Sequence, residues 1–390
     1  MLPGIGIFGC GELVRILVAN LRSKGFRVEA IWSHCLETAQ QMARELDIKL
    51  ATDVIDRVLL ESSIQLIVIA CPPHLHEQIA TKACGIGKHV LCDCPPALSY
   101  DQMLAMKKAA FNYPSLITIF FNTLRFLPAF VKMKSLIADG YIGQINVINC
   151  NVFGSSLQGL DNYSVSCDEL MGGGLLSTIG THVIDIITFV TELRAKRVTG
   201  IVKSFNQLKD NVFGLRRITA DDFVTFQMEM QNSLTVANVT LNSHYCGKFS
   251  HEILICGSKG YLVCRSGDLY AQLNSSGKEE LLFADSDDPI SDNCPYGKGL
   301  SRMLSALKNA FQFSPETECM PNGFNDGDGH PNNGSGVDVH SNDEILHRWA
   351  KEAVGLAANF EDGLYVQAVI EAIKYSSKNR EWVRIKYDMN

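Results

Sequence analysis

Residues 4–15, GIGIFGCGELVR, combine a short strand, a glycine turn and the start of a helix. The apolar run at residues 5–8 is typical of a buried strand, Gly9-Cys10-Gly11 predicts a tight turn, and a helical pattern begins at Glu12. A glycine-rich motif in this setting indicates dinucleotide binding. The glycines let the backbone approach a pyrophosphate, whose charge is then held by free N–H groups at the helix N-terminus.

The glycines of this segment allow two alignments with the dinucleotide motif. Gly4-x-Gly6-x-x-Gly9 fits the pattern literally, but its first two glycines precede the strand or lie inside it. Gly9-x-Gly11-x-x-Val14 falls on the turn itself, with Val14 where a third glycine or alanine is usual. We interpret the second alignment as the cofactor turn. The cofactor contacts expected here are Gly9, Gly11, Glu12 and Leu13.

Composition limits the class of protein. The chain has 390 residues, which exceeds one typical core and predicts two domains. Its net charge of −7 comes without a basic block, so we expect no nucleic-acid partner. No apolar run approaches the roughly 20 residues that span a bilayer, so we expect no membrane partner either. We interpret residues 1–25 as part of the fold, because removing them as a signal peptide would delete the first strand.

The 13 cysteines are scattered, without the spacing of a zinc site or a redox CxxC motif. An odd number of cysteines favours a reducing compartment, so we expect a cytoplasmic protein, with secretion as the alternative. No metal site is predicted. Asp326-x-Asp328 lacks the glycine and glutamate spacing of a calcium loop.

The residues after the second predicted strand, 26–32 (FRVEAIW), bear on cofactor choice. In nucleotide-binding folds of this type, an Asp or Glu at that position bonds the ribose 2′-hydroxyl and favours NAD. This chain has Ser33 and His34, which leave no carboxylate to repel a 2′-phosphate and could donate hydrogen bonds to one. We therefore expect NADP, with NAD as the less favoured cofactor. The alternative is that His34 is only an exposed loop residue.

Two later turns also follow buried strands. Residues 66–70 (LIVIA) lead to Cys71-Pro72-Pro73-His74-Leu75-His76, and residues 89–92 (HVLC) lead to Asp93-Cys94-Pro95. Ligands bind at the carboxyl ends of strands in open α/β sheets. Further cofactor contacts are therefore expected at Cys71, Pro72, His76 and Asp93. The alternation of strands and helices predicts an α/β domain at residues 1–121, with a Rossmann-type doubly wound parallel sheet.

Beyond residue 121 the pattern changes to helices followed by long alternating strands. Residues 122–390 are predicted to form an α+β domain with an open, mainly antiparallel sheet. The exposed face of such a sheet needs a cover, so we expect a homodimer formed through it. Residues 314–343 are rich in Gly, Asn, Asp and Pro and are predicted to be a disordered loop.

Several segments, in this order, resemble the glucose–fructose oxidoreductase/inositol dehydrogenase (Gfo/Idh/MocA) family. The resemblance covers residues 4 to about 190, and the later strands fit the second domain of that family. The matching motifs are Gly9-x-Gly11, Cys71-Pro72-Pro73-His74-Leu75-His76, Gly87-Lys88-His89-Val90-Leu91-Cys92, Asn122-x-x-Arg125-Phe126, and Gly172-Gly173-Gly174 with Gly180-Thr181-His182-Val183-Ile184-Asp185.

The resemblance implies three catalytic positions, of which one is kept. The family motif Glu-Lys-Pro, whose lysine binds the substrate hydroxyl and holds positive charge near the nicotinamide, is Asp93-Cys94-Pro95 here. The family has an Asp four residues before the catalytic His, and this chain has Thr178 before His182. The motif Asn122-x-x-Arg125-Phe126 also resembles that of the family, and this resemblance implies substrate contacts at Asn122 and Arg125.

These replacements bear directly on hydride transfer. Oxidising an alcohol needs a base for the hydroxyl proton and a donor or cation for the developing alkoxide, and losing one such group slows the reaction by about 10²–10³-fold. We therefore expect an NADP(H)-binding protein with weak or no dehydrogenase activity and a sensor or scaffold role. One alternative is an active NADP-dependent oxidoreductase on a sugar or polyol, using His182 with a partner such as Arg125. Another is a structural or matrix-associated interaction protein that binds no nucleotide.

Overall fold

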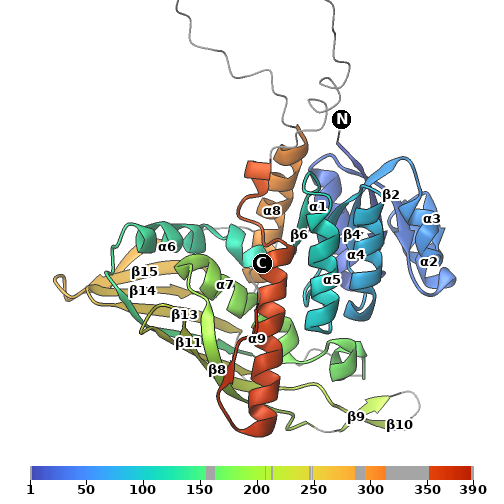
Figure 1. The fold of residues 1–390 in the computed structure, drawn as a ribbon. Coiled ribbons are helices and arrows are strands. Elements are labelled where there is room, and N and C mark those ends of the chain that lie inside the picture. Colours follow the sequence, from blue (N-terminus) through green and yellow to red (C-terminus); the bar gives the residue numbers. More distant parts are fainter. Residues whose placement is uncertain are drawn as a thin grey trace, which may run out of the picture.

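The computed structural model describes residues 2–154, 163–206, 208–211, 214–245, 247, 249–285, 295–312 and 351–387. The predicted disordered loop, residues 314–343, lies outside the described residues. Two sheets lie side by side, each with its own helices, and a long helix lies between them (Figure 1).

The first sheet is a six-stranded parallel sheet in the order β3-β2-β1-β4-β5-β6. This result confirms the predicted Rossmann-type doubly wound sheet. Its strands are apolar and buried on both faces, as parallel sheets covered by helices require. The strands are β1 (Gly4–Phe8), β2 (Arg27–Trp32), β3 (Leu50–Thr52), β4 (Ile64–Ile69), β5 (His89–Cys92) and β6 (Thr118–Phe120), and the helices are α1 (Glu12–Ser23), α2 (Leu36–Glu45), α3 (Ile55–Leu59), α4 (His76–Gly85) and α5 (Tyr100–Phe111).

A helix from much later in the chain completes this layer. α8 (Pro295–Gln312) buries Leu300, Met303 and Leu307 in the same apolar cluster as Ile5 and Val14 of the first sheet and α1. Residues 295–312, which the sequence groups with the second domain, thus pack on the first sheet.

The second sheet has nine strands in the order β16-β15-β14-β13-β7-β12-β11-β8-β17. β7 and β12 run parallel and all other neighbours run antiparallel, which confirms the predicted open, mainly antiparallel sheet. The strands are β7 (Ile145–Phe153), β8 (Ala195–Lys203), β11 (Phe223–Met230), β12 (Val236–Asn242), β13 (Ser250–Gly257), β14 (Gly260–Arg265), β15 (Asp268–Leu273), β16 (Glu280–Phe283) and β17 (Val383–Arg384). A separate hairpin is formed by β9 (Leu208–Asn211) and β10 (Gly214–Arg217).

Three helices cover one face of this sheet: α6 (Pro128–Ala138), α7 (Thr181–Thr191) and α9 (Phe360–Asn379) (Figure 1). The segment Glu169–Thr191, which includes α7, is long and apolar enough to cross a membrane, but 78% of its most apolar window is buried inside the protein. Its apolar character is therefore explained by its place in the core.

α9 lies between the two sheets and is bonded to both sides. Its N-terminus carries a capping box, in which the side chains of Asn359 and Asp362 bond each other's backbone N–H groups. On the first-domain side, Glu371 accepts a hydrogen bond from the backbone of Tyr100 at 2.5 Å. On the second-domain side, Ser377 accepts one from the backbone of Val202 at 2.8 Å. α9 therefore fixes the two sheets relative to each other.

Candidate functional site

The turn after β1 has the geometry of a dinucleotide cradle. Gly9 has φ +133°, and a Cβ there would lie 2.2 Å from the carbonyl oxygen of Ala70, so only glycine fits. Gly11 is the N-cap residue of α1 and has no side chain to bond the first N–H groups of that helix. A Cβ on Gly11 would point into open space. Free N–H groups behind an open position fit a pyrophosphate, with Glu12 and Leu13 as the first residues of the helix.

Val14 occupies the place of the usual third glycine. Its side chain is fully buried in one cluster with Ile7 and Leu17, and its N–H donates to the carbonyl of Gly11 at 3.0 Å. α1 thus packs on the sheet with a valine at this position, and the departure from the glycine pattern leaves the turn intact.

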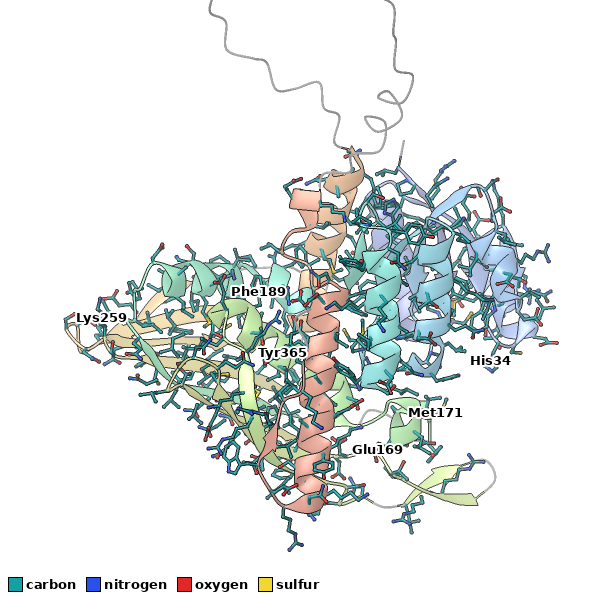
Figure 2. The ribbon with its side chains drawn as sticks, in the orientation of Figure 1. His34, Glu169, Met171, Phe189, Lys259 and Tyr365 are labelled. Atoms are coloured by element: carbon teal, nitrogen blue, oxygen red, sulfur yellow. The ribbon has the colours of Figure 1, made fainter. Side chains whose placement is uncertain are left out.

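The two residues expected to select the cofactor differ in exposure. Ser33 is buried, and its hydroxyl accepts a hydrogen bond from the backbone of Cys35 at 3.4 Å. His34 is exposed at the end of β2 (Figure 2). The carboxylate of Glu37, in the first turn of α2, accepts a hydrogen bond from the Cys35 thiol at 3.0 Å.

His76, predicted as a cofactor contact, instead joins the two neighbouring turns. Its ring is buried, with Nε2 2.8 Å from the carbonyl oxygen of Cys71 and Nδ1 3.3 Å from that of Pro96. Burial lowers the pKa of His76. The imidazole therefore holds together the turns after β4 and β5, and its contact with the cofactor stays a prediction. Cys71 is also buried, while Pro72 is half-buried at the start of its turn.

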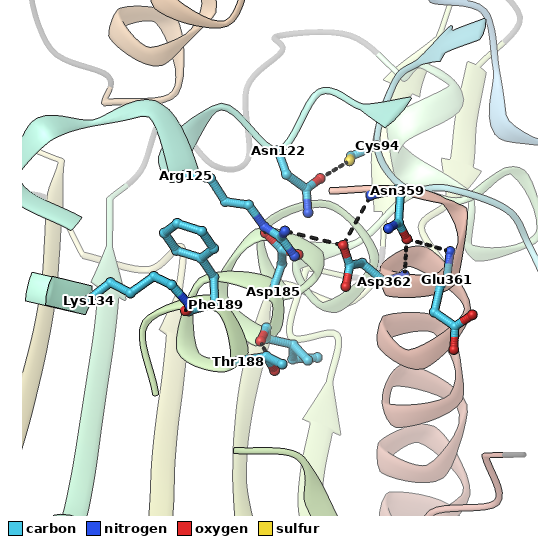
Figure 3. Close-up of polar contacts among 11 residues, drawn as sticks. Cys94, Asn122, Arg125, Lys134, Asp185, Thr188, Phe189, Asn359, Glu361 and Asp362 are labelled. Atoms are coloured by element: carbon cyan, nitrogen blue, oxygen red, sulfur yellow. Dashed lines mark hydrogen bonds and ion pairs between the residues drawn. The ribbon is translucent and has the colours of Figure 1, made fainter. Parts of the chain in front are cut away.

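Cys94 follows β5 and contacts the predicted substrate residue Asn122. Its thiol donates to Oδ1 of Asn122 at 2.8 Å (Figure 3). Its backbone N–H donates to Oδ1 of Asp93 at 2.8 Å. Burial, with the charges of Asp93 and Asp185, raises the pKa of Cys94 well above its usual value, although Arg125 opposes this. Burial also raises the pKa of Asp93 to about 6. Cys94 is therefore a neutral thiol whose proton is directed at Asn122.

Arg125, also predicted to contact substrate, is fully engaged inside the protein. It lies in a short helical turn, Thr123–Phe126, and its guanidinium bonds Asp185 of α7 through two hydrogen bonds. A third nitrogen lies 3.2 Å from the carboxylate of Asp362 in α9, and the ring of Phe189 packs 5.1 Å from the guanidinium carbon (Figure 3). Arg125 is buried and joins three elements, and its contact with a substrate stays a prediction.

Thr178 and His182 lie on either side of a change in helix type. Leu176–Gly180 is a π-helical turn that precedes α7, and such turns are frequent at functional sites. The Thr178 hydroxyl donates to the carbonyl of Gly174 at 2.7 Å. Burial lowers the pKa of His182 to about 4, so its imidazole is neutral at pH 7. Burial, with a smaller contribution from the nearby His182, also lowers the pKa of His251 in β13 to about 4.

Asp221 has a role that the sequence did not reveal. Its carboxylate accepts a hydrogen bond from the N–H of Leu176 at 2.8 Å, and its backbone carbonyl accepts one from Leu175 at 3.0 Å. Gly174 has φ +105°, and a Cβ there would lie 2.2 Å from the Asp221 carboxylate. The glycine is therefore required by this contact. The sequence holds no local sign of this role, because Asp221 lies 47 positions after Gly174 and meets it only in the fold.

The triple glycine also touches the first domain. A Cβ on Gly172 would lie 2.8 Å from the side chain of Pro73 in the turn after β4. The second domain thus approaches the carboxyl ends of β4 and β5, the edge at which Cys94 lies. The structure connects Cys94, Asn122 and Arg125 in one group and leaves Ser33 and His34 at the end of β2. Within the described residues, no group of three or more His, Cys, Asp or Glu side chains could hold a metal ion.

Comparison with known proteins agrees with this arrangement. Residues 4–120 match the oxidoreductase family with an NAD-binding Rossmann fold, and residues 130–263 match the GFO/IDH/MocA C-terminal domain. The chain is 40% identical over 395 residues to glucose-fructose oxidoreductase domain-containing protein 2 of Homo sapiens, covering 99% of this chain and 94% of that protein. It is 38% identical over 395 residues to glucose-fructose oxidoreductase domain-containing protein 1 of Mus musculus, covering 99% of this chain and 93% of that protein.

Solved structures share the fold at lower identity. Levoglucosan dehydrogenase in complex with NADH and L-sorbose superposes with a TM-score of 0.75 at 20% identity, over 99% of both chains. A super-repressor mutant of Gal80p from Saccharomyces cerevisiae superposes with a TM-score of 0.75 at 19% identity, over 100% of both chains. Both halves of the chain match the family domains, and the two relatives are 40% and 38% identical in sequence over 99% of this chain. The chain therefore belongs to the GFO/IDH/MocA oxidoreductase family, whose first domain is an NAD(P)-binding Rossmann fold.

Proposed function

We propose that this protein binds NADP(H) at the turn after β1 and has weak or no dehydrogenase activity, acting as a sensor or scaffold. A bound nicotinamide supplies the hydride acceptor, and the chain must supply the base and the charge stabilisation. The observation that carries the proposal is the engagement of Arg125 by Asp185 and Asp362.

Hydride transfer from an alcohol first needs a positive charge or a strong donor beside the developing alkoxide. The group at position 94 is a thiol that donates to Asn122, and a neutral thiol is a weak donor. Arg125 is the cation that acts on Cys94 electrostatically, but two carboxylates already balance its charge. An alkoxide beside Cys94 would therefore gain little stabilisation from either group.

The reaction also needs a base that removes the hydroxyl proton. A general base works best when its pKa lies near the working pH. The pKa of His182 is lowered to about 4 by burial, so its imidazole accepts a proton only weakly at pH 7. The Thr178 hydroxyl donates to its own helix and carries no charge that would raise the basicity of His182.

For the cofactor, we propose NADP in preference to NAD. Ser33 and His34 follow β2 and include no carboxylate, and the exposed imidazole of His34 can turn toward a 2′-phosphate. Affinities for NADPH and NADH, measured side by side by titration calorimetry, test this choice. A tighter NADH complex would overturn it.

A second candidate is an active oxidoreductase on a sugar or polyol. It is favoured by the retention of His182 and by the shared fold with a levoglucosan dehydrogenase bound to NADH and L-sorbose. The fold alone does not choose between the candidates, because a Gal80p super-repressor mutant has it as well.

The deciding experiment has two parts. Small molecules released from freshly purified protein by denaturation are identified by mass spectrometry, and NADPH formation is then followed with a panel of polyols and aldoses. We expect co-purified NADP(H) and little turnover. Robust turnover that is lost in His182→Ala would support the active enzyme instead. A protein that carries no nucleotide and shows no thermal shift with NADP would support the interaction protein without nucleotide.

We propose in addition a homodimer formed through the second sheet in a reducing compartment. The face of this sheet opposite the helices carries half-buried polar side chains, among them Asn149, which accepts a hydrogen bond from Asn238 at 3.0 Å. The ten cysteines among the described residues are all free thiols, which fits the cytoplasm. Size-exclusion chromatography with light scattering tests the dimer, and a monomeric mass would refute it.

A further inference from the structure

Two thiols outside the proposed catalytic group lie beside the nucleotide turn. β1 and β2 are parallel neighbours in which Phe8 pairs with Trp32, and the N–H of Gly9 donates to the carbonyl of Trp32 at 2.9 Å. The turns that follow these strands therefore start side by side. Cys10 lies in the first turn, and Cys35 is the N-cap residue of α2 at the end of the second.

Two adjacent residues, Trp32 and Ser33, connect these cysteines: Trp32 contacts Cys10, and Ser33 contacts Cys35. The Ser33 hydroxyl accepts a hydrogen bond from the backbone N–H of Cys35 at 3.4 Å. The Cys10 sulfur lies 3.9 Å from the carbonyl oxygen of Trp32, the residue before Ser33. Burial raises the pKa of Cys10, and the nearby Cys35 thiol adds to the increase.

Exposure separates this pair from most other thiols. Cys10 and Cys35 are both half-buried, so a small reagent can reach them. Of the other described cysteines, six are buried. The two remaining half-buried thiols are Cys94, which bonds Asn122, and Cys256, which lies in β13 of the second sheet.

We propose that Cys10 and Cys35 form a redox-sensitive thiol pair, and that a disulfide between them closes the site to the nucleotide. The second part rests on the proposed binding of NADP(H). The oxidant that we assign is glutathione disulfide, which exchanges with accessible thiols.

The exchange proceeds in two balanced steps. Cys35 gives its proton to the Glu37 carboxylate, which lies 3.0 Å from the sulfur, and the thiolate attacks one sulfur of glutathione disulfide. A mixed disulfide forms and one glutathione leaves as a thiolate that takes up a proton. Cys10 then loses its proton and attacks the Cys35 sulfur, the bond from Cys35 to glutathione breaks, and the second glutathione leaves as a thiolate that takes up that proton. Two protein thiols have lost two electrons and two protons, and one glutathione disulfide has become two glutathione molecules.

The product changes the geometry at the nucleotide turn. A disulfide holds the two Cβ atoms about 3.5–4.5 Å apart, so it ties the turn that contains Gly9 and Gly11 to the start of α2. The bridge crosses Ser33, where the adenosine ribose is expected, beside the backbone that must approach the pyrophosphate. We therefore expect the oxidised protein to bind NADPH about tenfold more weakly or worse, the size of effect that follows the loss of a hydrogen bond to a charged group.

The experiment uses the full chain, reduced and then equilibrated in glutathione buffers of increasing oxidised fraction. Free thiols are blocked, the protein is digested, and linked peptides are identified by mass spectrometry. NADPH affinity is measured on the same samples by fluorescence titration. The variant Cys35→Ser removes the pair, and Cys256→Ser is the matched control because Cys256 is also a half-buried thiol.

We expect a Cys10–Cys35 linked peptide and weakened NADPH binding in the wild type and in Cys256→Ser, and an affinity independent of oxidation in Cys35→Ser. Glutathione on Cys35 alone, no linked peptide at any ratio, or a linked pair with unchanged affinity would each overturn the proposal. A linked pair in a protein that binds no NADPH even when reduced would refute the proposed cofactor and the closure of its site, while leaving the thiol pair established.

Discussion

The guanidinium of Arg125 forms two hydrogen bonds with the carboxylate of Asp185, 2.8 Å from Nε to Oδ2 and 2.5 Å from Nη2 to Oδ1. Both side chains are buried, and Asp362 lies against the third nitrogen of the guanidinium. All three nitrogens of this guanidinium therefore lie against carboxylates inside the protein. The same contact ties α7 and α9 to the chain segment that leaves the first sheet, so it serves the assembly of the site.

Removing one partner of this pair should strongly destabilise the protein. Asp185→Asn leaves the buried Arg125 charge beside a neutral amide, with only the contact to Asp362 remaining, and breaking a buried pair costs up to about 3–5 kcal/mol. Urea denaturation followed by circular dichroism measures the change in the free energy of unfolding. Arg197→Ala, at an exposed pair with Glu229, is the control and should change stability little. Equal effects of the two variants would contradict the structural role.

The two glycines of the turn should respond differently to substitution. Gly9→Ala places a methyl group against the Ala70 carbonyl at a backbone conformation that alanine avoids, which costs at least about 1–3 kcal/mol. Gly11→Asp points into open space and supplies a favoured N-cap, so stability should be kept. Its carboxylate occupies the pyrophosphate position, so NADPH affinity should fall below detection. Thermal unfolding and fluorescence titration separate the two effects, and NADPH binding by a folded Gly11→Asp would refute the cradle.

Restoring the missing catalytic groups should create activity. In the double variant Cys94→Lys and Thr178→Asp, the lysine supplies the absent cation and the aspartate lies one turn before His182. Turnover on the best polyol of a panel should rise by about 10²–10³-fold for each recovered electrostatic group. NADPH absorbance is the readout, and Cys256→Lys is a control that adds a charge far from the strand ends. An unchanged rate with NADP binding intact would mean that no substrate site accompanies the fold.

The choice between NADP and NAD should depend on position 34. His34→Asp introduces a carboxylate where a 2′-phosphate is expected, so NADPH affinity should fall by about tenfold or more while NADH affinity is kept or improved. His34 is exposed, so the fold should be unaffected. His34→Gln keeps a donor without adding charge and serves as the control. Parallel losses for both nucleotides would remove His34 from the recognition of the phosphate.

Stability should fall as the pH is lowered from about 6.5 to 4. Burial lowers the pKa of His89, His182 and His251 to about 4 from 6.5, so in this window the unfolded chain binds more protons and acid favours it. Asp93 and Asp221 act in the opposite direction, because burial raises the pKa of each from 3.8 to about 6.

These three histidines against two carboxyl groups leave about one proton, and His76, whose pKa burial also lowers, adds to it. The slope should therefore be at least about 1.4 kcal/mol per pH unit. Denaturant midpoints measured across the window give this slope. Asp221→Asn removes one opposing group and should steepen it, whereas a slope of the reverse sign would show that the carboxyl groups dominate.

The local features of this protein could be predicted from the sequence. The first sheet follows from apolar runs that end in glycine or proline turns, and the cradle from Gly9 and Gly11, whose roles depend on neighbouring backbone. Ser33 and His34 follow from counting to the end of one strand. Such features arise from contacts over a few residues, and the hydrophobic pattern records them directly.

The sequence by itself therefore determined the two fold classes and the residues available at each strand end. Only the tertiary structure decided what those residues do. It pairs Arg125 with Asp185, 60 positions later, and with Asp362 near the end of the chain. It also packs α8 on a sheet whose strands lie far earlier in the sequence. It places the Cys94 thiol as a hydrogen-bond donor to Asn122. The reason is physical: a buried charge or donor takes whichever partner the packing brings within hydrogen-bond distance, and that distance is set by the whole fold.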